Sequence, residues 1–230
     1  MADPVCIVMV KEPTPGSVKT RLTPPLTAEE AAGLATCFAQ DTVARVQLLG
    51  SKVIIAFYPE TAGQKLQSMF PAQDLVWVEQ VGDDLGARLD SVMSYAASLG
   101  YGPLVAVGTD SPTVPTSFIQ TAFDSLNAGE AEFALGRTED GGFYLVGIRS
   151  YRSNLFAKID WGTALAFEQA LRNAKTHRLR TAELPTWYDV DTFPDLLRLR
   201  NELATGEESR GRAPATFTWL QTHESQLARR

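Results

Sequence analysis

The chain has 230 residues, a formal net charge of −6 and a 44% share of hydrophobic residues. This composition is typical of a globular protein and excludes intrinsic disorder, which combines low hydrophobicity with high net charge. The acidic balance argues against a nucleic-acid partner, because nonspecific binding to nucleic acid needs a basic face. It leaves room for a small basic pocket that binds an anionic metabolite.

Strands and helices alternate along the chain. Continuous apolar runs are typical of strands that are covered on both faces, and Thr27 with Glu30 forms a capping box that predicts a helix start. In chain order the predicted elements are strand 5–10, helix 27–49, strand 52–58, helix 61–70, strand 75–81, helix 86–100, strand 103–108, helix 117–126, strands 131–137 and 142–148, helix 163–175, strand 177–184, and helices 193–203 and 216–227.

This alternation predicts an α/β fold with a mostly parallel sheet and helices on both faces. Strands 131–137 and 142–148, joined by the turn TEDGG, break the rhythm and indicate an antiparallel or mixed element. The polar stretch 204–214 is interpreted as an exposed loop before a terminal helix. No long linker divides the chain, so we expect one domain over residues 1–230.

The cysteines and the first ten residues bear on the expected cellular location of the protein. Residues 1–10 carry no basic segment ahead of the apolar run, so we interpret them as a first strand and not as a signal peptide. Cys6 and Cys37 are expected to be two buried thiols in a reducing cytoplasm, with no disulfide. No apolar run approaches the ~20 residues of a membrane-spanning helix, so no membrane contact is expected.

The loop after the first strand is basic. Lys11, Lys19 and Arg21 follow the strand directly, and Gly16 allows a ligand to approach the backbone closely. In open α/β sheets ligands bind beyond the carboxyl ends of the strands, so we interpret this loop as a phosphate-binding site. The alternative is a solvated loop that its prolines stiffen. Val18 precedes Lys19 where a P-loop needs glycine, and no G-x-G-x-x-G follows the strand.

Carboxylates follow two other strands. Asp110 ends the apolar strand 103–108, where one or two carboxylates together with substrate phosphates can hold Mg²⁺. The alternative is that Asp110 caps the following helix. Asp189 and Asp191 are two residues apart and are expected to face the same side. Either one is a candidate second metal ligand, although Asp191 or Thr192 is also a candidate N-cap for helix 193–203.

Two further clusters have equally open interpretations. Asp84, Gly86 and Arg88 follow the third strand and either contact a base or ribose or simply begin a helix. In the turn between the late strands, the glycines either serve hairpin geometry or let an acceptor approach the backbone. The residues of this turn are Asp140, Gly141 and Gly142. The two histidines stand in polar surroundings and suggest no catalytic triad.

Five motifs occur in a fixed order over roughly residues 5–200. They are K-x-P-x-P-G-x-V-K-T-R-L, Q-x-G-x-D-L-G-x-R-L, G-T-D-S-P, D-G-G-F-Y-L-V-G and D-V-D-T-x-x-D-L. Together they resemble the rSAM/selenodomain-associated, or arsenosugar-biosynthesis, glycosyltransferases. That family is similar to the larger nucleotide-diphospho-sugar transferase superfamily, whose relatives include guanylyltransferases for 2-phospho-lactate and for the molybdenum cofactor.

The resemblance implies a Rossmann-like GT-A sandwich, Mg²⁺ or Mn²⁺, and a nucleoside triphosphate or sugar nucleotide as donor to a small-molecule acceptor. By position, Asp110 matches the metal carboxylate and Asp191 the second ligand, with Asp189 as the other candidate. Lys19, Arg21 and Asp110 are the predicted catalytic residues, and Asp140, Gly141 and Gly142 the predicted acceptor site. The predicted nucleotide-binding residues are Lys11, Pro15, Gly16, Lys19, Thr20, Arg21, Asp84, Gly86 and Arg88.

The reaction itself is left open by the sequence. Three cations suit a triphosphate and favour nucleotidyl transfer, whereas the resemblance favours glycosyl transfer. The acidic signature T-D-S-P differs from the D-x-D that is usual in glycosyltransferases. A protein of the same fold that binds nucleotide without turnover is the alternative from another functional class. A phosphatase-like hydrolase fits poorly, because Asp110 does not stand in a D-x-D-x-[TV] motif after the first strand.

Overall fold

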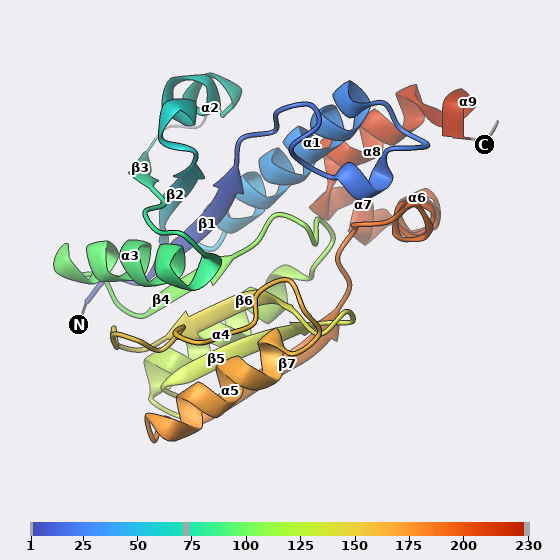
Figure 1. The fold of residues 1–230 in the computed structure, drawn as a ribbon. Helices are drawn as coiled ribbons and strands as arrows, with labels where there is room; N and C mark the ends of the chain where they lie inside the picture. Colours follow the sequence, from blue (N-terminus) through green and yellow to red (C-terminus); the bar gives the residue numbers. More distant parts are fainter. Residues whose placement is uncertain (1, 71–73, 228–230) are drawn as a thin grey trace.

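A computed structural model describes residues 2–70 and 74–227 of the protein. Its strands form one seven-stranded sheet in the order β3-β2-β1-β4-β6-β5-β7 (Figure 1). The strands are β1 Val5–Lys11, β2 Lys52–Tyr58, β3 Leu75–Glu79, β4 Leu104–Val107, β5 Phe133–Thr138, β6 Phe143–Ile148 and β7 Thr181–Trp187.

One strand, β6, runs against the others. β1 pairs in parallel with β2 and β4, β2 pairs in parallel with β3, and β5 pairs in parallel with β7. β6 is antiparallel to both of its neighbours, β4 and β5. The prediction of a mostly parallel sheet with an antiparallel element late in the chain is therefore confirmed. The carboxyl ends of the parallel strands and the β5–β6 turn share one edge of the sheet.

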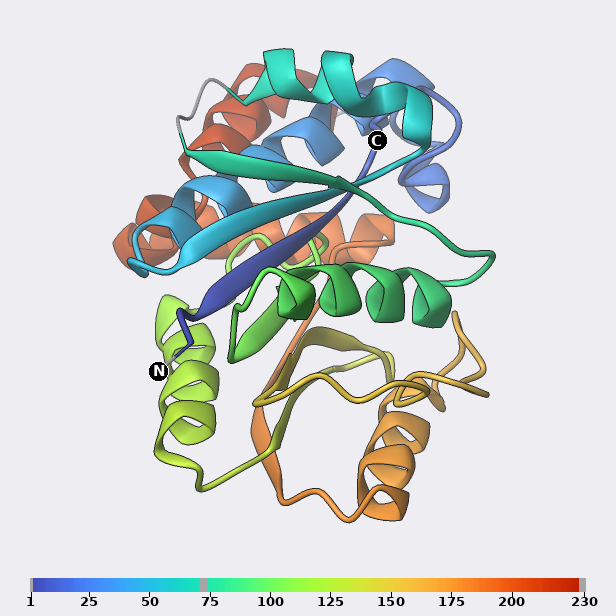
Figure 2. The same ribbon diagram turned by 90° about the vertical axis from the view of Figure 1, so that its left-hand side faces the viewer.

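Helices cover both faces of the sheet (Figure 2). Buried side chains of α1, α2 and α4 pack on one face, and those of α3 and α5 pack on the other. The helices are α1 Ala28–Gln47, α2 Gly63–Met69, α3 Leu85–Ser98, α4 Thr116–Ala128, α5 Ala166–Thr176, α6 Phe193–Thr205, α7 Glu207–Arg212, α8 Pro214–Thr222 and α9 Glu224–Leu227, with short 3₁₀ helices η1 Thr20–Leu22 and η2 Glu60–Ala62.

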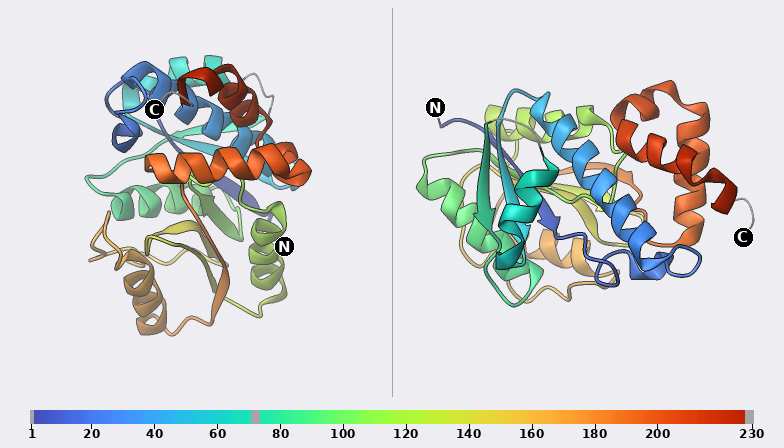
Figure 3. Two further views of the ribbon diagram at one scale, coloured as in Figure 1. Left: turned by 90° about the vertical axis from the view of Figure 1, so that its right-hand side faces the viewer. Right: turned by 90° about the horizontal axis from the view of Figure 1, so that it is seen from above.

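A third apolar core lies outside the sheet, between α1 and the C-terminal helices (Figure 3). α1 uses two faces, because Val43 packs toward the sheet while Leu34 and Phe38 pack toward α6 and α8. The predicted capping box at the start of α1 is present: the Thr27 side chain accepts from Glu30 N at 3.1 Å, and the Glu30 carboxylate accepts from Thr27 N at 2.7 Å.

Two predictions near the C-terminus are wrong. The stretch 204–214 is not a loop, since it contains α7, whose Ser209 is buried and donates to Glu202 Oε1 at 2.7 Å. The predicted terminal helix is two helices, α8 and α9, divided at His223. The sequence of α7 is polar because a six-residue helix needs only a small buried face, here Ser209. Its composition therefore looks like that of a loop.

The last strand begins later than predicted. β7 starts at Thr181 and not at residue 177, because Arg178 has a left-handed φ of 58° that ends the preceding helix in a tight turn. The Leu179 amide then donates back to Ala174 O at 3.0 Å. β7 also continues past the predicted end at residue 184, because Trp187 pairs with Thr138 of β5.

The cysteine prediction is correct for Cys6 and incomplete for Cys37. Both thiols are free; Cys6 is buried, whereas Cys37 is only partly buried. Burial, followed by the charge of Asp41, raises the pKa of the Cys37 thiol to about 11. Over residues 2–70 and 74–227, no helix combines the length and apolar character that crossing a bilayer requires.

A buried carboxylate connects the C-terminal helices to α1. Asp41, in the middle of α1, accepts hydrogen bonds from Ala215 N at 2.9 Å and from Thr216 N at 2.8 Å. These amides belong to the first turn of α8, where backbone N–H groups lack partners within their own helix. Asp41 therefore caps α8 from a position more than 170 residues away in the sequence.

We predict that Asp41→Ala lowers the free energy of unfolding by about 2 kcal/mol, because it leaves buried amides without an acceptor. Urea denaturation measures the change. Asp124→Ala is the matched control, since the exposed Asp124 carboxylate bonds only to Gln120 of its own helix. Its expected effect stays within about 0.5 kcal/mol. Equal losses in the two variants would contradict the capping role.

Candidate functional site

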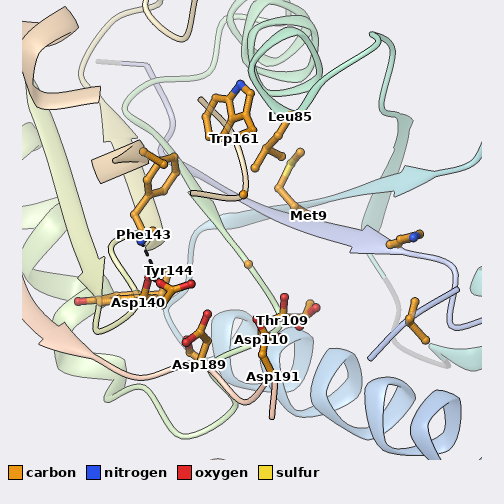
Figure 4. A pocket seen from close by; sticks show the side chains of 18 of the residues that line it. Met9, Leu85, Thr109, Asp110, Asp140, Phe143, Tyr144, Trp161, Asp189 and Asp191 are labelled. Carbon is orange, nitrogen blue, oxygen red and sulfur yellow. Dashed lines mark hydrogen bonds between the residues drawn. The ribbon is translucent and has the colours of Figure 1, made fainter. Parts of the chain in front are cut away.

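A cleft of about 510 Å³ opens at the edge of the sheet where the parallel strands end (Figure 4). Lys11 ends β1, Asp110 follows β4, and Asp189 and Asp191 follow β7, so the cleft gathers residues from strand ends across the sheet. This is where open α/β sheets bind ligands. The lining residues with polar side chains are Lys11, Ser17, Lys19, Gln80, Arg88, Thr109, Asp110, Ser111, Thr138, Asp140, Tyr144, Thr163, Asp189 and Asp191.

Lys19 lies at the centre of the site. Its side chain is only 5% exposed, and its Nζ forms ion pairs with Asp110 and, at 2.9 Å, with Asp191 Oδ1. Burial by itself lowers the pKa of the ammonium, but the two carboxylates outweigh burial and raise the pKa above its ordinary value. Lys19 is therefore held as a cation between two residues that the sequence predicted as metal ligands.

The loop that carries Lys19 is shaped by two left-handed residues. Gly16 has a φ of +78°, which glycine adopts without cost, and Lys19 itself has a φ of 47°. A left-handed conformation costs a non-glycine residue about 1–2 kcal/mol. Lys11 Nζ donates to Ser17 O at 2.7 Å and closes the loop on β1. These contacts direct the Lys19 side chain into the cleft.

Arg21 adds a second cation from the rim. It is exposed and pairs with Asp191 Oδ2, so Asp191 is bound by both cations of the loop. Burial tends to raise the pKa of the Asp191 carboxyl, but Lys19 and Arg21 outweigh burial and lower it. Pro15, Gly16, Thr20 and Arg21 lie outside the lining of the cleft, and Lys11 and Lys19 line it.

Three carboxylates crowd together on the other side of Asp191. Asp140, Asp189 and Asp191 each place an oxygen within 4.8 Å of the others. Burial, followed by the charges of Asp140 and Asp191, raises the pKa of Asp189 to about 6. The sequence predicted two of these residues as metal ligands and the third as an acceptor residue. Asp110 is not in this group and pairs with Lys19 instead.

Hydrogen bonds fix the loops that carry the carboxylates. The Asp195 carboxylate accepts from Thr192 N at 2.7 Å and from Asp191 N at 3.2 Å, which makes Thr192 the N-cap of α6 and leaves the Asp191 side chain free for the cleft. Val190 N donates to Asp110 O at 2.9 Å. The loops after β4 and β7 are thus joined directly through their backbones.

A second network fixes the same loops from behind. The Glu202 carboxylate of α6 accepts from Tyr188 Oη, from Thr113 Oγ1 at 3.2 Å and from Ser209 Oγ at 2.7 Å. Thr113 follows the Asp110 loop and Tyr188 precedes Asp189, so one carboxylate connects both loops to the C-terminal helices. On the α1 side, Arg45 Nη1 donates to Pro112 O.

The cluster after β3 has a structural explanation. The Asp84 carboxylate accepts from Ala87 N at 2.7 Å and caps α3. This agrees with the prediction that the cluster begins a helix. A Cβ at Gly86 would lie 2.4 Å from Phe156 O, so close packing requires glycine there. Arg88 lines the cleft, donates to Gly82 O at 2.9 Å and stacks 3.8 Å from the centre of the Tyr58 ring. Asp84 and Gly86 do not line the cleft.

The β5–β6 turn also uses its residues for geometry. Asp140 Oδ1 accepts from Thr138 Oγ1 at 2.6 Å and from Gly142 N at 2.9 Å. Gly141 has a φ of +92°, and a Cβ there would lie 2.3 Å from Ala164 O. Asp140 and Gly142 line the cleft, whereas Gly141 packs against the segment before α5.

Sequence reasoning missed one part of the lining. Met9, Leu85, Phe143 and Trp161 form an apolar wall, and Trp161 belongs to a segment without regular structure between β6 and α5. Apolar residues at the ends of elements look like core residues, so hydrophobicity alone gives no signal for them. Gln80, Leu85 and Phe143 belong to the motifs, without a predicted role of their own; Gln80 is buried and donates to Ala56 O at 2.6 Å.

We predict that Gly141→Ala destabilises the protein much more than Gly100→Ala. Both glycines have left-handed φ values, +92° and +86°, but only a Cβ at 141 meets other atoms within 4 Å. The conformational cost, about 1–2 kcal/mol, is common to both variants. Overpacking against Ala164 should add about 1–3 kcal/mol to the loss for Gly141→Ala. Urea denaturation measures both; similar losses would show that contact with Ala164 is unimportant.

Residues 42–163 match the protein family described as "Uncharacterized protein conserved in bacteria (DUF2064)". The chain belongs to this family. The whole chain also aligns with 98% of a protein from Desulfovibrio desulfuricans G20, at 30% identity and a TM-score of 0.90. The description of that protein assigns it provisionally to the nucleotide-diphospho-sugar transferases. A comparison with curated protein sequences finds no match.

Two further solved structures resemble this chain in fold at low sequence identity. A cytidylyltransferase from Leptospira borgpetersenii aligns over 100% of this chain and 98% of its own, at 14% identity and a TM-score of 0.55. A CMP:2-keto-3-deoxy-manno-octonic acid synthetase complexed with CTP aligns over 88% and 99%, at 12% identity and a TM-score of 0.56. The predicted Rossmann-like GT-A fold class is confirmed. The narrower assignment to the arsenosugar type stays a prediction.

Proposed function

We propose that the protein binds a nucleoside triphosphate or sugar nucleotide in the cleft, together with Mg²⁺ or Mn²⁺, and transfers a nucleotidyl or glycosyl group to a small-molecule acceptor. The observation that carries this proposal is the convergence of Lys19 and Arg21 with Asp110 and Asp191 at one edge of the sheet. Loops that are far apart in the sequence bring side chains of opposite charge together there. The names of the proteins that share the fold support a nucleotide donor.

The charge balance of the site supports a metal requirement. Asp110 and Asp191 pair with Lys19 and Arg21, whereas in the described part of the chain no lysine or arginine forms an ion pair with Asp140 or Asp189. A phosphate alone would be repelled by the carboxylates that remain uncompensated. The oxygens of Asp140, Asp189 and Asp191 fit a divalent cation, because they are hard ligands that already lie within 4.8 Å of one another.

Asp189 and Asp191 are the proposed metal ligands, with Asp140 beside them. A bound divalent cation neutralises donor phosphates and the charge that grows on a leaving phosphate. Asp110 is proposed to hold the Lys19 ammonium at the edge of that site. This differs from the role that the motif implied for Asp110, and the difference rests on the position of Asp110 outside the group of Asp140, Asp189 and Asp191.

The residues of the loop supply the remaining electrostatics. In nucleotidyl transfer, an acceptor phosphate oxygen bonds to the α-phosphorus, the α–β phosphoanhydride bond breaks, and pyrophosphate leaves. In glycosyl transfer, an acceptor hydroxyl oxygen bonds to the anomeric carbon and loses its proton to water. The bond between that carbon and the donor phosphate breaks, and a nucleoside diphosphate leaves. Negative charge grows on the departing phosphate in both reactions, and Lys19 and Arg21 are placed to stabilise it. Analysis of the released product distinguishes the two.

The first test is a thermal-shift panel of the four ribonucleoside triphosphates and of common sugar nucleotides, with and without Mg²⁺ or Mn²⁺. We expect stabilisation only when nucleotide and metal are both present, because the carboxylates oppose a bare phosphate. At 100 times its dissociation constant a ligand adds about 2.7 kcal/mol of stability. The absence of any shift, or an equal shift with EDTA, would contradict the proposal.

The second test removes single charges. We predict that Arg21→Ala weakens nucleotide binding about 10-fold to 100-fold, because a hydrogen bond to a charged group contributes about 1.5–3 kcal/mol. Calorimetry measures the affinity. Arg172→Ala, which removes an exposed arginine of α5, is the matched control and should leave affinity unchanged.

The variant Asp110→Asn distinguishes two hypotheses, an enzyme and a protein that binds nucleotide without turnover. Asparagine keeps the size of the side chain and removes the charge that holds Lys19. A loss of product formation with retained nucleotide binding fits an enzyme. Unchanged product formation in this variant would contradict the role proposed for the Asp110–Lys19 pair.

A further inference from the structure

The proposed transfer chemistry assigns no role to the apolar wall of the cleft. Met9 comes from β1, Leu85 begins α3, Phe143 begins β6, and Trp161 lies between β6 and α5. Figure 4 shows these four side chains together on one side of the cleft, opposite the group of aspartates. The cleft therefore has a charged end and an apolar end.

Packing contacts hold the side chains of this wall in place. The rings of Phe143 and Trp161 meet edge to face, with centroids 5.8 Å apart and an interplanar angle of 68°. The indole lies against α3 at a position where only glycine fits, since a Cβ at Gly86 would come within 3.0 Å of Trp161 Nε1. Met9, Phe143 and Trp161 pack onto the buried core and are only partly buried themselves. Their ring edges and the thioether thus present a fixed apolar surface to a ligand.

The wall offers no side-chain hydrogen bond to a ligand. Trp161 Nε1 has no hydrogen-bond partner among the described residues, but it is buried against Gly86 and does not face the open cleft. The nearby Thr163 hydroxyl donates to Asp160 O at 2.7 Å and accepts from Leu165 N at 3.2 Å. A nucleobase carries donors and acceptors around its edge, and burying such groups without partners is costly. An apolar group carries no such cost.

The polar side chains of Arg88 and Gln80 also line the cleft. Arg88 is stacked on Tyr58 at the end of β2, and Gln80 follows β3, so both lie on the β2–β3 side of the sheet. Two of the four wall residues, Phe143 and Trp161, belong to β6 and the segment after it, whereas Met9 comes from β1 and Leu85 from α3. Phe143 is the wall residue that lies toward Asp140, so the wall faces the space between it and the carboxylates, where the reacting groups of donor and acceptor would meet.

We propose that the wall of Met9, Leu85, Phe143 and Trp161 binds a hydrophobic ring or alkyl group of the acceptor. This inference rests on the proposed function, and it names the class of acceptor: a small molecule whose nucleophilic oxygen lies next to an apolar group of about the size of one ring. Discrimination comes from burial of that group, because each buried methylene contributes about 0.8 kcal/mol.

The test uses benzyl alcohol, 4-methylbenzyl alcohol and 4-ethylbenzyl alcohol as probes, with glycerol as the polar control. Ligand-observed NMR measures their binding to the full chain, with and without Mg²⁺ and a mixture of the four ribonucleoside triphosphates. We expect each added carbon to tighten binding about fourfold, the equivalent of about 0.8 kcal/mol. We also expect probe binding to persist when the nucleotides are present. Glycerol should show no comparable binding.

Variants locate the probes. Trp161→Ala should weaken benzyl alcohol binding about tenfold. Leu85→Ser, at a partly exposed position where folding is not at risk, should weaken it about threefold. Leu165→Ala is the matched control: Leu165 is an exposed apolar residue of the same segment that does not line the cleft, and its loss should leave probe binding within twofold.

Three results would overturn the inference. One is equal binding of glycerol and the benzyl alcohols, and another is unchanged binding in both Trp161→Ala and Leu85→Ser. The third is competitive displacement of the probes by nucleotide, which would assign the wall to the base of the donor. Failure of the proposed function looks different: nucleotides would produce no thermal shift while the benzyl alcohols still bound at the wall.

Discussion

The site depends on the buried ammonium of Lys19. Three parts of the chain meet at this one group: the loop after β1 that carries it, the loop after β4 with Asp110, and the loop after β7 with Asp191. Without a cation between them, Asp110 and Asp191 would repel each other across the cleft. Because the ammonium is shielded from water, its attraction to both carboxylates is screened much less than that of a surface ion pair. The same contact that closes the fold at this edge also sets the charge of the site.

The C-terminal helices make this arrangement rigid. A core of their own, between α1 and α6–α8, holds them in place. From there Glu202 and Asp195 reach the loops that carry the acidic side chains. Sites held within a fraction of an ångström of a productive geometry need such supporting contacts around the residues that meet the ligand. The helices beyond β7 thus support the candidate site, although none of the residues that line the cleft belongs to them.

The sequence predicts the sheet well because buried parallel strands are continuous apolar runs, and it predicts strand ends because polar residues follow them. It also identifies Lys19, Arg21, Asp110 and Asp191 as residues that meet. It does not show that Lys19 lies between the two carboxylates, since this depends on a left-handed backbone at Lys19 itself. The apolar wall was missed because Phe143 and Trp161 look like core residues until the cleft is known. Asp84 and Gly141 belong to matching motifs, yet their contacts serve a helix cap and a tight packing contact.

The reversed direction of β6 has a consequence for how the site can change. β5 runs toward the cleft and β6 leaves it, so a single short turn delivers both Asp140 and Phe143 to the same edge. The first contributes to the crowded carboxylates and the second to the apolar wall, with only Gly141 and Gly142 between them. Lengthening or shortening this turn would shift both at once. The proposed metal site and the proposed acceptor site are therefore coupled through the geometry of one hairpin.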